Sequence, residues 1–215
     1  MSSARAPFPE DLAAGFRRFR ASHYQGKRGR RWKAAADGAL PANMVVACSD
    51  ARSAPEVVFD AGPGELFVLR NVASVVPVHA PDGRSHAAGA ALEFAVLGLQ
   101  VGSIVVLGHD RCIGIAAVLD DPEPMGPTEY VGAWVAGMRG LLADVEPRHA
   151  DDPIRHRTAL ERATVEQSIA HLRTFPWIRS REESGVIGVH GAWFDILAGE
   201  LYTFNGDAWT RLGDT

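Results

Sequence analysis

The chain has 215 residues, of which 47% are hydrophobic and 22% are charged, and its formal net charge is -4 at pH 7. This length and composition predict a soluble globular protein with one domain and a substantial core. The slight negative charge argues against a nucleic-acid-binding protein, which needs a broad positive face. No apolar run approaches the roughly 20 residues that a membrane span requires.

The N-terminal segment predicts an amphipathic helix, because Leu12, Phe16 and Phe19 recur at helical spacing. The basic run KRGRRWK at residues 27–33 follows it, and we interpret this run as a solvated helix face rather than an anion or nucleic-acid patch. The first residues lack the apolar core of a secretory signal, so a cytoplasmic location is expected.

Short apolar runs predict buried strands at residues 44–48, 65–70 and 103–108, and residues 185–205 predict strand, turn, strand and strand. Helical patterns occupy residues 87–99, 129–146 and 160–175. Strands that alternate with helices predict an α/β fold with a mostly parallel central sheet flanked by helices. We expect a single domain over residues 1–215, with an N-terminal helical arm at 1–36 and an α/β core at 37–215.

Two short motifs stand at the ends of predicted strands. Cys48 ends the first strand within CSDAR, and GHDRC at residues 108–112 follows the third strand. In open α/β sheets the functional crevice lies beyond the carboxyl ends of the strands, so the two motifs can meet there. His109 and Cys112 are three positions apart, a spacing that lets one turn aim both side chains at one point. Cys48, His109 and Cys112 therefore form a candidate site with two thiolates and one imidazole.

Such a donor set suits zinc, which binds sulfur and nitrogen tetrahedrally and keeps a fourth position for water in catalytic sites. Other interpretations remain open for the two cysteines alone, which are often buried core thiols or a redox pair. The remaining histidines are expected to be surface or structural residues, and His190 a hydrogen-bonded core or interface residue.

CSDAR and GHDRC, with FDAGPGELFVLRNVASVVP between them, resemble the β-class carbonic anhydrase family, and the resemblance covers most of the chain. It implies one zinc ion per subunit, bound by Cys48, His109 and Cys112, with Asp50 and Arg52 as a catalytic dyad. It also implies a homodimer or homotetramer in which the N-terminal helices wrap over the partner subunit. Tyr24, Trp32 and the apolar residues of the first helix are then explained by packing against that partner.

The implied reaction is the reversible hydration of carbon dioxide to bicarbonate and a proton. Zinc lowers the pKa of a bound water to roughly 7, which makes hydroxide available at neutral pH. Asp50 would accept the hydroxide's hydrogen and orient it, while Arg52 would keep Asp50 ionised. In some relatives this aspartate instead becomes a fourth metal ligand and closes the site, so Asp50 is expected to be able to do the same if Arg52 releases it.

The resemblance also implies an apolar substrate pocket, whose walls are expected at Phe67, Val72, Phe94 and Ile113. The chain departs from the family pattern at several positions. Ile113 stands where glycine is common, so strain is expected if the backbone there needs a positive φ. Ala39 replaces a glutamine that helps to hold bicarbonate, Ser74 replaces an asparagine, and Ser53-Ala54 replaces Val-Asp.

These departures leave two alternatives open. Ile113 and Ala39 make the surroundings of the site less polar, as in relatives that hydrolyse carbonyl sulfide or carbon disulfide with the same zinc and dyad. The second alternative is a zinc-stabilised homologue without catalysis. The presence of both Asp50 and Arg52 argues against it, because a purely structural site does not require the dyad.

Overall fold

The structure of this chain is a computed structural model, which describes residues 7–25, 29–36, 38, 40–84, 86–120, 130–149 and 151–213. Ala39 and the first two residues of the basic run lie outside the described residues. Among the helices of the described residues, none combines the length and the apolar composition that crossing a bilayer would need.

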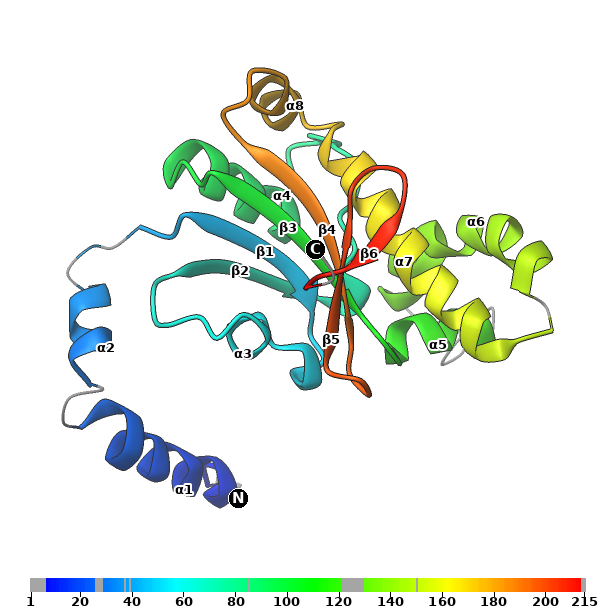
Figure 1. Cartoon of the computed structure of the whole chain (residues 1–215). Helices are drawn as coiled ribbons and strands as arrows, with labels where there is room; N and C mark the ends of the chain where they lie inside the picture. Colours follow the sequence, from blue (N-terminus) through cyan, green and yellow to red (C-terminus); the bar gives the residue numbers. More distant parts are fainter. Residues whose placement is uncertain are drawn as a thin grey trace, which may run out of the picture.

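A six-stranded sheet forms the centre of the molecule, in the order β2-β1-β3-β4-β5-β6 (Figure 1). The first four of these strands pair in parallel, and β5 and β6 continue the sheet as antiparallel neighbours. The fold class predicted from the sequence is therefore confirmed. The strands are β1 (Asn43–Cys48), β2 (Leu66–Asn71), β3 (Ser103–His109), β4 (Gly188–Asp195), β5 (Glu200–Phe204) and β6 (Trp209–Arg211).

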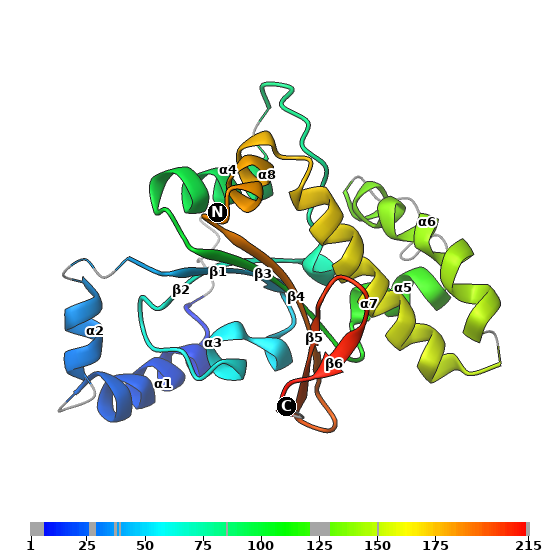
Figure 2. The ribbon, with the colours of Figure 1, turned by 45° about the horizontal axis from the view of Figure 1, so that its top comes forward.

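Helices cover the sheet on one face in two groups. Side chains of α4, α7 and α8 pack with β1 and β3 in the larger core cluster, and those of α5, α6 and α7 form a second cluster around the two cysteines. Figure 2 shows α4, α7 and α8 on one side of the sheet and α3 on the other. The helices are α3 (Pro55–Val58), α4 (Ala87–Glu93), α5 (Ile113–Asp120), α6 (Val131–His149), α7 (Pro153–Leu172) and α8 (Pro176–Glu183), with short helical turns η2 (Ala51–Ser53), η3 (Val72–Ser74) and η4 (Phe94–Gly98).

The structure extends α7 seven residues upstream of the predicted helix start. The carboxylate of Asp152 accepts hydrogen bonds from the backbone N–H groups of Ile154 and Arg155, both at 3.1 Å, and Pro153 occupies the first turn. This is a helix N-terminus set by capping rather than by apolar periodicity. At the other end the helix stops at Leu172, because Pro176 opens a separate helix, α8.

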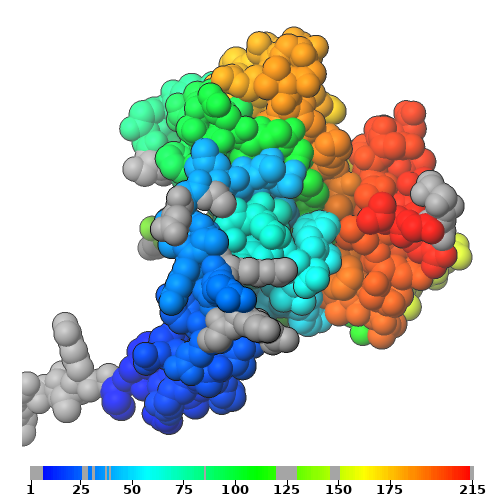
Figure 3. Space-filling model, turned by 60° about the vertical axis from the view of Figure 1, so that its left-hand side comes forward, coloured from blue at the N-terminus to red at the C-terminus, as the bar shows by residue number. Residues whose placement is uncertain are grey.

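The predicted N-terminal arm is helical: α1 (Glu10–Phe19), η1 (Arg20–Tyr24) and α2 (Gly29–Ala36). It projects away from the sheet, and the space-filling view shows it as a separate lobe beside the body (Figures 1 and 3). The Phe19 ring packs edge-on against Trp32 at 5.3 Å within the arm. Leu12 and Phe16, by contrast, are 57% and 61% exposed, so the apolar stripe of α1 has no cover within the described chain.

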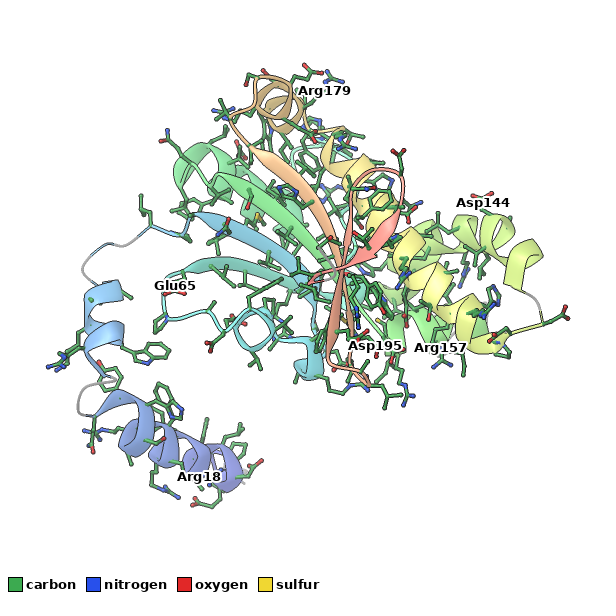
Figure 4. All side chains as sticks on the ribbon, viewed as in Figure 1. Arg18, Glu65, Asp144, Arg157, Arg179 and Asp195 are labelled. Carbon is green, nitrogen blue, oxygen red and sulfur yellow. The ribbon has the colours of Figure 1, made fainter. Side chains whose placement is uncertain are left out.

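Charged side chains mark the outside of these elements. In Figure 4 the labelled Arg18, Glu65, Asp144 and Arg179 extend outward from α1, the start of β2, α6 and α8. The sheet interior instead holds the apolar run of β1, which is buried from Met44 to Cys48. The chemistry of this fold is therefore expected where strands end rather than along their length.

Candidate metal centre

Parallel pairing brings the two sequence motifs together. β1 and β3 run side by side with Ala47 opposite Leu107, so Cys48 and His109 leave the sheet at the same edge. In Figure 1 the arrowheads of both strands point toward the side of the molecule that carries α5. Cys112 then follows on a turn directly before α5, and Arg111 within that turn has a φ of 54°.

The three predicted ligands form one buried cluster. The ligand atoms of Cys48, His109 and Cys112 all lie within 4.8 Å of one another, and no other such group occurs among the described residues. The two sulfur atoms are 3.9 Å apart. A disulfide would need about 2.05 Å, whereas two sulfurs bound tetrahedrally at about 2.3 Å from one zinc ion lie about 3.8 Å apart. The spacing therefore suits metal ligands.

His109 presents a free lone pair to the cluster. Its Nδ1 lies 2.8 Å from the backbone carbonyl of Asp110, which can only accept, so Nδ1 carries the hydrogen. Its Nε2 is buried and has no hydrogen-bond partner among the described residues. A buried polar atom without a partner is costly, and a bound metal ion is the partner that this geometry fits.

The pKa values of the two thiols are shifted in opposite directions. Cys112, which can donate a hydrogen bond to the sulfur of Cys48, lowers the pKa of Cys48. The same contact, together with burial, raises the pKa of Cys112. One thiolate is therefore favoured by the protein alone, and a divalent cation is the partner that would favour two. The donor set of two sulfurs and one imidazole nitrogen fits zinc.

Asp50 and Arg52 form an ion pair beside the cluster. Arg52 donates from Nη2 to Oδ2 of Asp50 at 2.6 Å and from Nε to Oδ1 at 3.0 Å. These hydrogen bonds lower the pKa of Asp50 to about 2 and keep it ionised. Asp50 contributes no atom to the three-ligand cluster, because Arg52 engages both of its oxygens.

A turn, not an extended strand, brings the pair together. The strand ends at Cys48, and the Asp50 carboxylate accepts a hydrogen bond at 2.9 Å from the backbone N–H of Arg52, which caps the short helical turn η2. Alternation along a strand would place Cys48, Asp50 and Arg52 on one side by a period of two. Aspartate side chains readily accept hydrogen bonds from nearby backbone N–H groups, and such a bond competes with continuation of the strand.

Two polar residues of the site were missed by sequence reasoning. Arg70, on β2, donates to the backbone carbonyls of Cys48 at 2.8 Å and Asp50 at 2.6 Å, so it holds the chain on both sides of Ser49. Its signal was a lone charge at the end of an apolar strand. Glu161, on α7, is 3% exposed, and burial raises its pKa to about 7. No sequence pattern singled out Glu161.

The four predicted pocket residues lie outside the small cavity beside the cluster. That cavity has a volume of about 10 Å³, which is room for a single water. Phe67 pairs with Met44, four positions before the strand end, and its ring packs 5.9 Å from that of Phe94. Val72 and Ile113 are 42% and 73% exposed. Their role as pocket walls stays a prediction.

The strain considered for Ile113 is absent, because Ile113 is the first residue of α5 and does not have a positive φ. Positive φ values occur instead at Ala73 (62°) and Ser74 (54°), which line the small cavity. This conformation costs free energy for residues other than glycine. Trp134 supports the turn by donating from its indole nitrogen to the carbonyl of Val72 at 2.9 Å.

A larger cavity of about 420 Å³ lies between α6, α7 and Trp209. It shares no lining residue with the cavity beside the cluster, and among its described lining residues are two arginines and two carboxylates without a cysteine or histidine. The chemistry of the ligands, rather than the size of the cavity, therefore identifies the site.

Comparison with known proteins identifies the family of the chain. The carbonic anhydrase family model matches residues 43–201. The chain is 33% identical to a carbonic anhydrase of Pseudomonas aeruginosa over 91% of this chain and 87% of that protein. It is also 33% identical to β carbonic anhydrase 6 of Arabidopsis thaliana, a mitochondrial protein, over 88% of this chain but only 65% of that protein's length.

Solved structures agree on the fold. The β-carbonic anhydrase CcaA superimposes with a TM-score of 0.84 at 24% identity, covering 94% of this chain and 91% of that one. A β-carbonic anhydrase of Sordaria macrospora, described as tetrameric, superimposes with a TM-score of 0.69 at 26% identity and covers 94% of this chain and 95% of its own. Because the family model matches most of the chain and the relatives are 33% identical to it, the chain belongs to the β-carbonic anhydrase family.

Proposed function

We propose that this chain is a zinc-dependent carbonic anhydrase, which hydrates carbon dioxide reversibly to bicarbonate and a proton. One observation carries the proposal above the others. The buried Nε2 of His109 has no partner among the described residues, and it faces two thiols whose spacing suits a shared tetrahedral ion. The family membership supports the same reaction class.

Cys48, His109 and Cys112 would hold the zinc ion, with Nδ1–H of His109 fixed by the Asp110 carbonyl. Zinc held in this way supplies an activated water near neutral pH. The ionised carboxylate of Asp50 would accept a hydrogen bond from the reacting water. This bond would orient a lone pair of the water oxygen toward the substrate.

Arg52 keeps Asp50 ready for this role. The hydrogen bonds from its guanidinium hold the carboxylate in one orientation and favour the ionised form. Arg52 also donates to the carbonyl of Arg111 at 3.0 Å, which ties the dyad to the turn that carries Cys112. The dyad and one of the metal ligands are therefore positioned by a common set of bonds.

We also propose that the protein acts as a homodimer or a larger homo-oligomer. Apolar side chains next to the cluster in the chain remain exposed, namely Val72 at 42%, which follows the pairing partner of Cys48, and Ile113 at 73%, which follows Cys112. Carbon dioxide offers little to hydrogen-bond, so an apolar wall suits it, and a second copy seated on this surface would enclose the substrate. The tetrameric Sordaria macrospora relative supports an assembly of this kind.

Metal analysis and two assays on the purified protein test the proposal. We expect one zinc per chain and rapid hydration of carbon dioxide, measured by stopped flow with a pH indicator. Release of sulfide from carbonyl sulfide with only feeble hydration would instead assign the chain to the hydrolases. Stoichiometric zinc with neither activity would make it a non-catalytic homologue.

A further inference from the structure

The third metal ligand is the least firmly held by the strands. Cys48 and His109 are the last residues of β1 and β3, each fixed by a parallel neighbour. Cys112 instead lies on the turn after β3, next to Arg111 with its positive φ of 54°. Its sulfur can serve a metal only if something outside the strand ladder fixes this turn.

Glu161 supplies such a tether. Its Oε1 accepts a hydrogen bond from the backbone N–H of Cys112 at 3.2 Å, and its Oε2 accepts one from the indole N–H of Trp193 at 3.1 Å. Glu161 is 3% exposed and lines the small cavity with His109 and Cys112. Both of its oxygens therefore face N–H donors, a pattern that only a group with two acceptor oxygens satisfies.

The second anchor is itself rigid. Trp193 is 3% exposed, lies on β4 opposite Gly108, and packs against Tyr202 with ring centroids 5.6 Å apart. The guanidinium of Arg162, the residue after Glu161, lies 4.6 Å from the centre of the Trp193 ring. The tether thus connects the Cys112 turn to α7 and to the central sheet at once.

No ion pair explains the buried carboxylate, since the described salt bridges do not include Glu161. Burying a carboxylate without a cation costs free energy, which its two hydrogen bonds only partly offset. We infer that Glu161 is a positioning residue whose hydrogen bond to the Cys112 backbone sets the Cys112 sulfur for metal binding. This inference rests on the proposed metal centre.

Glu161→Gln tests the inference with little change in shape. A glutamine has one acceptor oxygen and one amino group, so it can satisfy only one of the two N–H donors and confronts the other with a donor. We expect zinc affinity, measured by competition with a chelator, to fall about 10- to 100-fold, the range typical of groups that orient metal ligands. The visible spectrum of the cobalt-substituted protein should change as well, because it reports thiolate geometry.

The matched control is Glu166→Gln, on the same helix. Glu166 also accepts a hydrogen bond from a tryptophan, Trp209 at 2.7 Å, but it has no contact with the cluster among its described bonds. The zinc affinity of the Glu166→Gln variant should equal that of the parent protein. Urea unfolding of each metal-free variant separates a general loss of stability from a specific loss of zinc binding.

A double variant tests whether the loss of zinc affinity comes from the mismatch between the glutamine amide and its two N–H donors. In Glu161→Gln with Trp193→Phe, the competing indole donor is gone, so the glutamine oxygen can serve Cys112 alone. We expect zinc affinity to recover toward that of the single Trp193→Phe variant, which should stay within about threefold of the parent because the Cys112 bond remains. If the first variant is poorly folded, the rescued variant still gives a reading.

The outcomes are distinguishable. If the parent binds no zinc, the metal centre itself is wrong. If the parent binds zinc and Glu161→Gln binds it equally tightly, the positioning role is wrong. A double variant that is weaker than Glu161→Gln, or a Trp193→Phe variant as weak as it, would also overturn the inference, because packing damage rather than donor matching would then be the cause.

Discussion

At the scale of single residues, Asp50 performs two tasks with one carboxylate. It accepts the backbone N–H of Arg52, which closes the turn after β1, and it accepts the Arg52 guanidinium, which keeps it ionised. The turn and the dyad are therefore built by the same side chain. A substitution that keeps the turn but removes the negative charge can separate the two tasks.

Asp50→Asn is that substitution. The amide oxygen can still accept the backbone N–H of Arg52, so the turn and the zinc content should be retained, while an uncharged amide is a poor acceptor for the reacting water. We expect hydration activity to fall by about 100-fold or more. The matched control is Asp152→Asn at the start of α7, where asparagine caps equally well and activity should be unchanged. Parent-level activity in Asp50→Asn would contradict the dyad mechanism.

Cys112→Ser addresses the metal ligand itself. A serine hydroxyl nearly matches the thiol in size but does not ionise near neutral pH, so it replaces the packing without replacing the ligand. We expect far less than one zinc per chain by atomic emission, with the far-ultraviolet circular dichroism preserved. Stoichiometric, tightly bound zinc in this variant would remove Cys112 from the ligand set.

At the scale of elements, α7 is positioned by glycines in the sheet. A Cβ atom at Gly108 would lie 2.6 Å from a methyl group of Val165, and one at Gly191 would lie 2.8 Å from the end of Ile169. The absence of side chains lets α7 pack closely over β3 and β4, just before the strand end that carries His109. This close approach also puts Glu161 within reach of the Cys112 turn.

Gly108→Ala should therefore destabilise the protein by about 1–3 kcal/mol through overpacking, because the branched Val165 side chain has little freedom to move. Urea unfolding measures the change. Gly137→Ala, in α6, is the matched control: nothing lies within 4 Å of its added Cβ, so alanine should stabilise the helix by about 0.5–1 kcal/mol. Equal stability of the two variants would show that α7 tolerates displacement.

At the scale of the whole molecule, the N-terminal arm lies apart from the body and exposes an apolar stripe (Figure 3). The stripe includes Phe8, Leu12 and Phe16, each more than half exposed. An apolar surface of this kind is usually covered by another chain. We therefore expect the arm to be buried only in the proposed assembly. The cytoplasmic location of the protein stays a prediction.

Phe16→Asp should weaken the assembly. A carboxylate in the apolar stripe would have to be buried against the partner, so we expect sedimentation velocity to show a shift toward monomer at a protein concentration where the parent is oligomeric. The matched control is Ile154→Asp, which places the same charge on a residue that is 78% exposed at the start of α7 and should leave the assembly intact. An unchanged parent-like assembly in Phe16→Asp would exclude the stripe from the interface.

The sequence predicted three strands within residues 185–205, where the structure has two, β4 and β5, and it did not predict β6. It did predict β1, β2 and β3, the main helices and a candidate cluster of Cys48, His109 and Cys112. Each of these follows from local patterns, because apolar runs select buried strands and parallel pairing brings the strand ends of Cys48 and His109 to one edge. The sequence also singled out Asp50 and Arg52, which form an ion pair in the structure. It did not predict the turn that joins them, because a side chain that bonds to the nearby backbone competes with the strand pattern.

The contacts that hold these candidate ligands in place could not be predicted from the sequence. Glu161 reaches the Cys112 backbone across 49 positions of sequence, and Arg70 reaches Asp50 across 20. Such contacts have no periodic signature, because they depend on how closely α7 and β2 approach the site in three dimensions. The strained backbone at Ala73 and Ser74 likewise belongs to the packed molecule, since neither residue type favours a positive φ on its own.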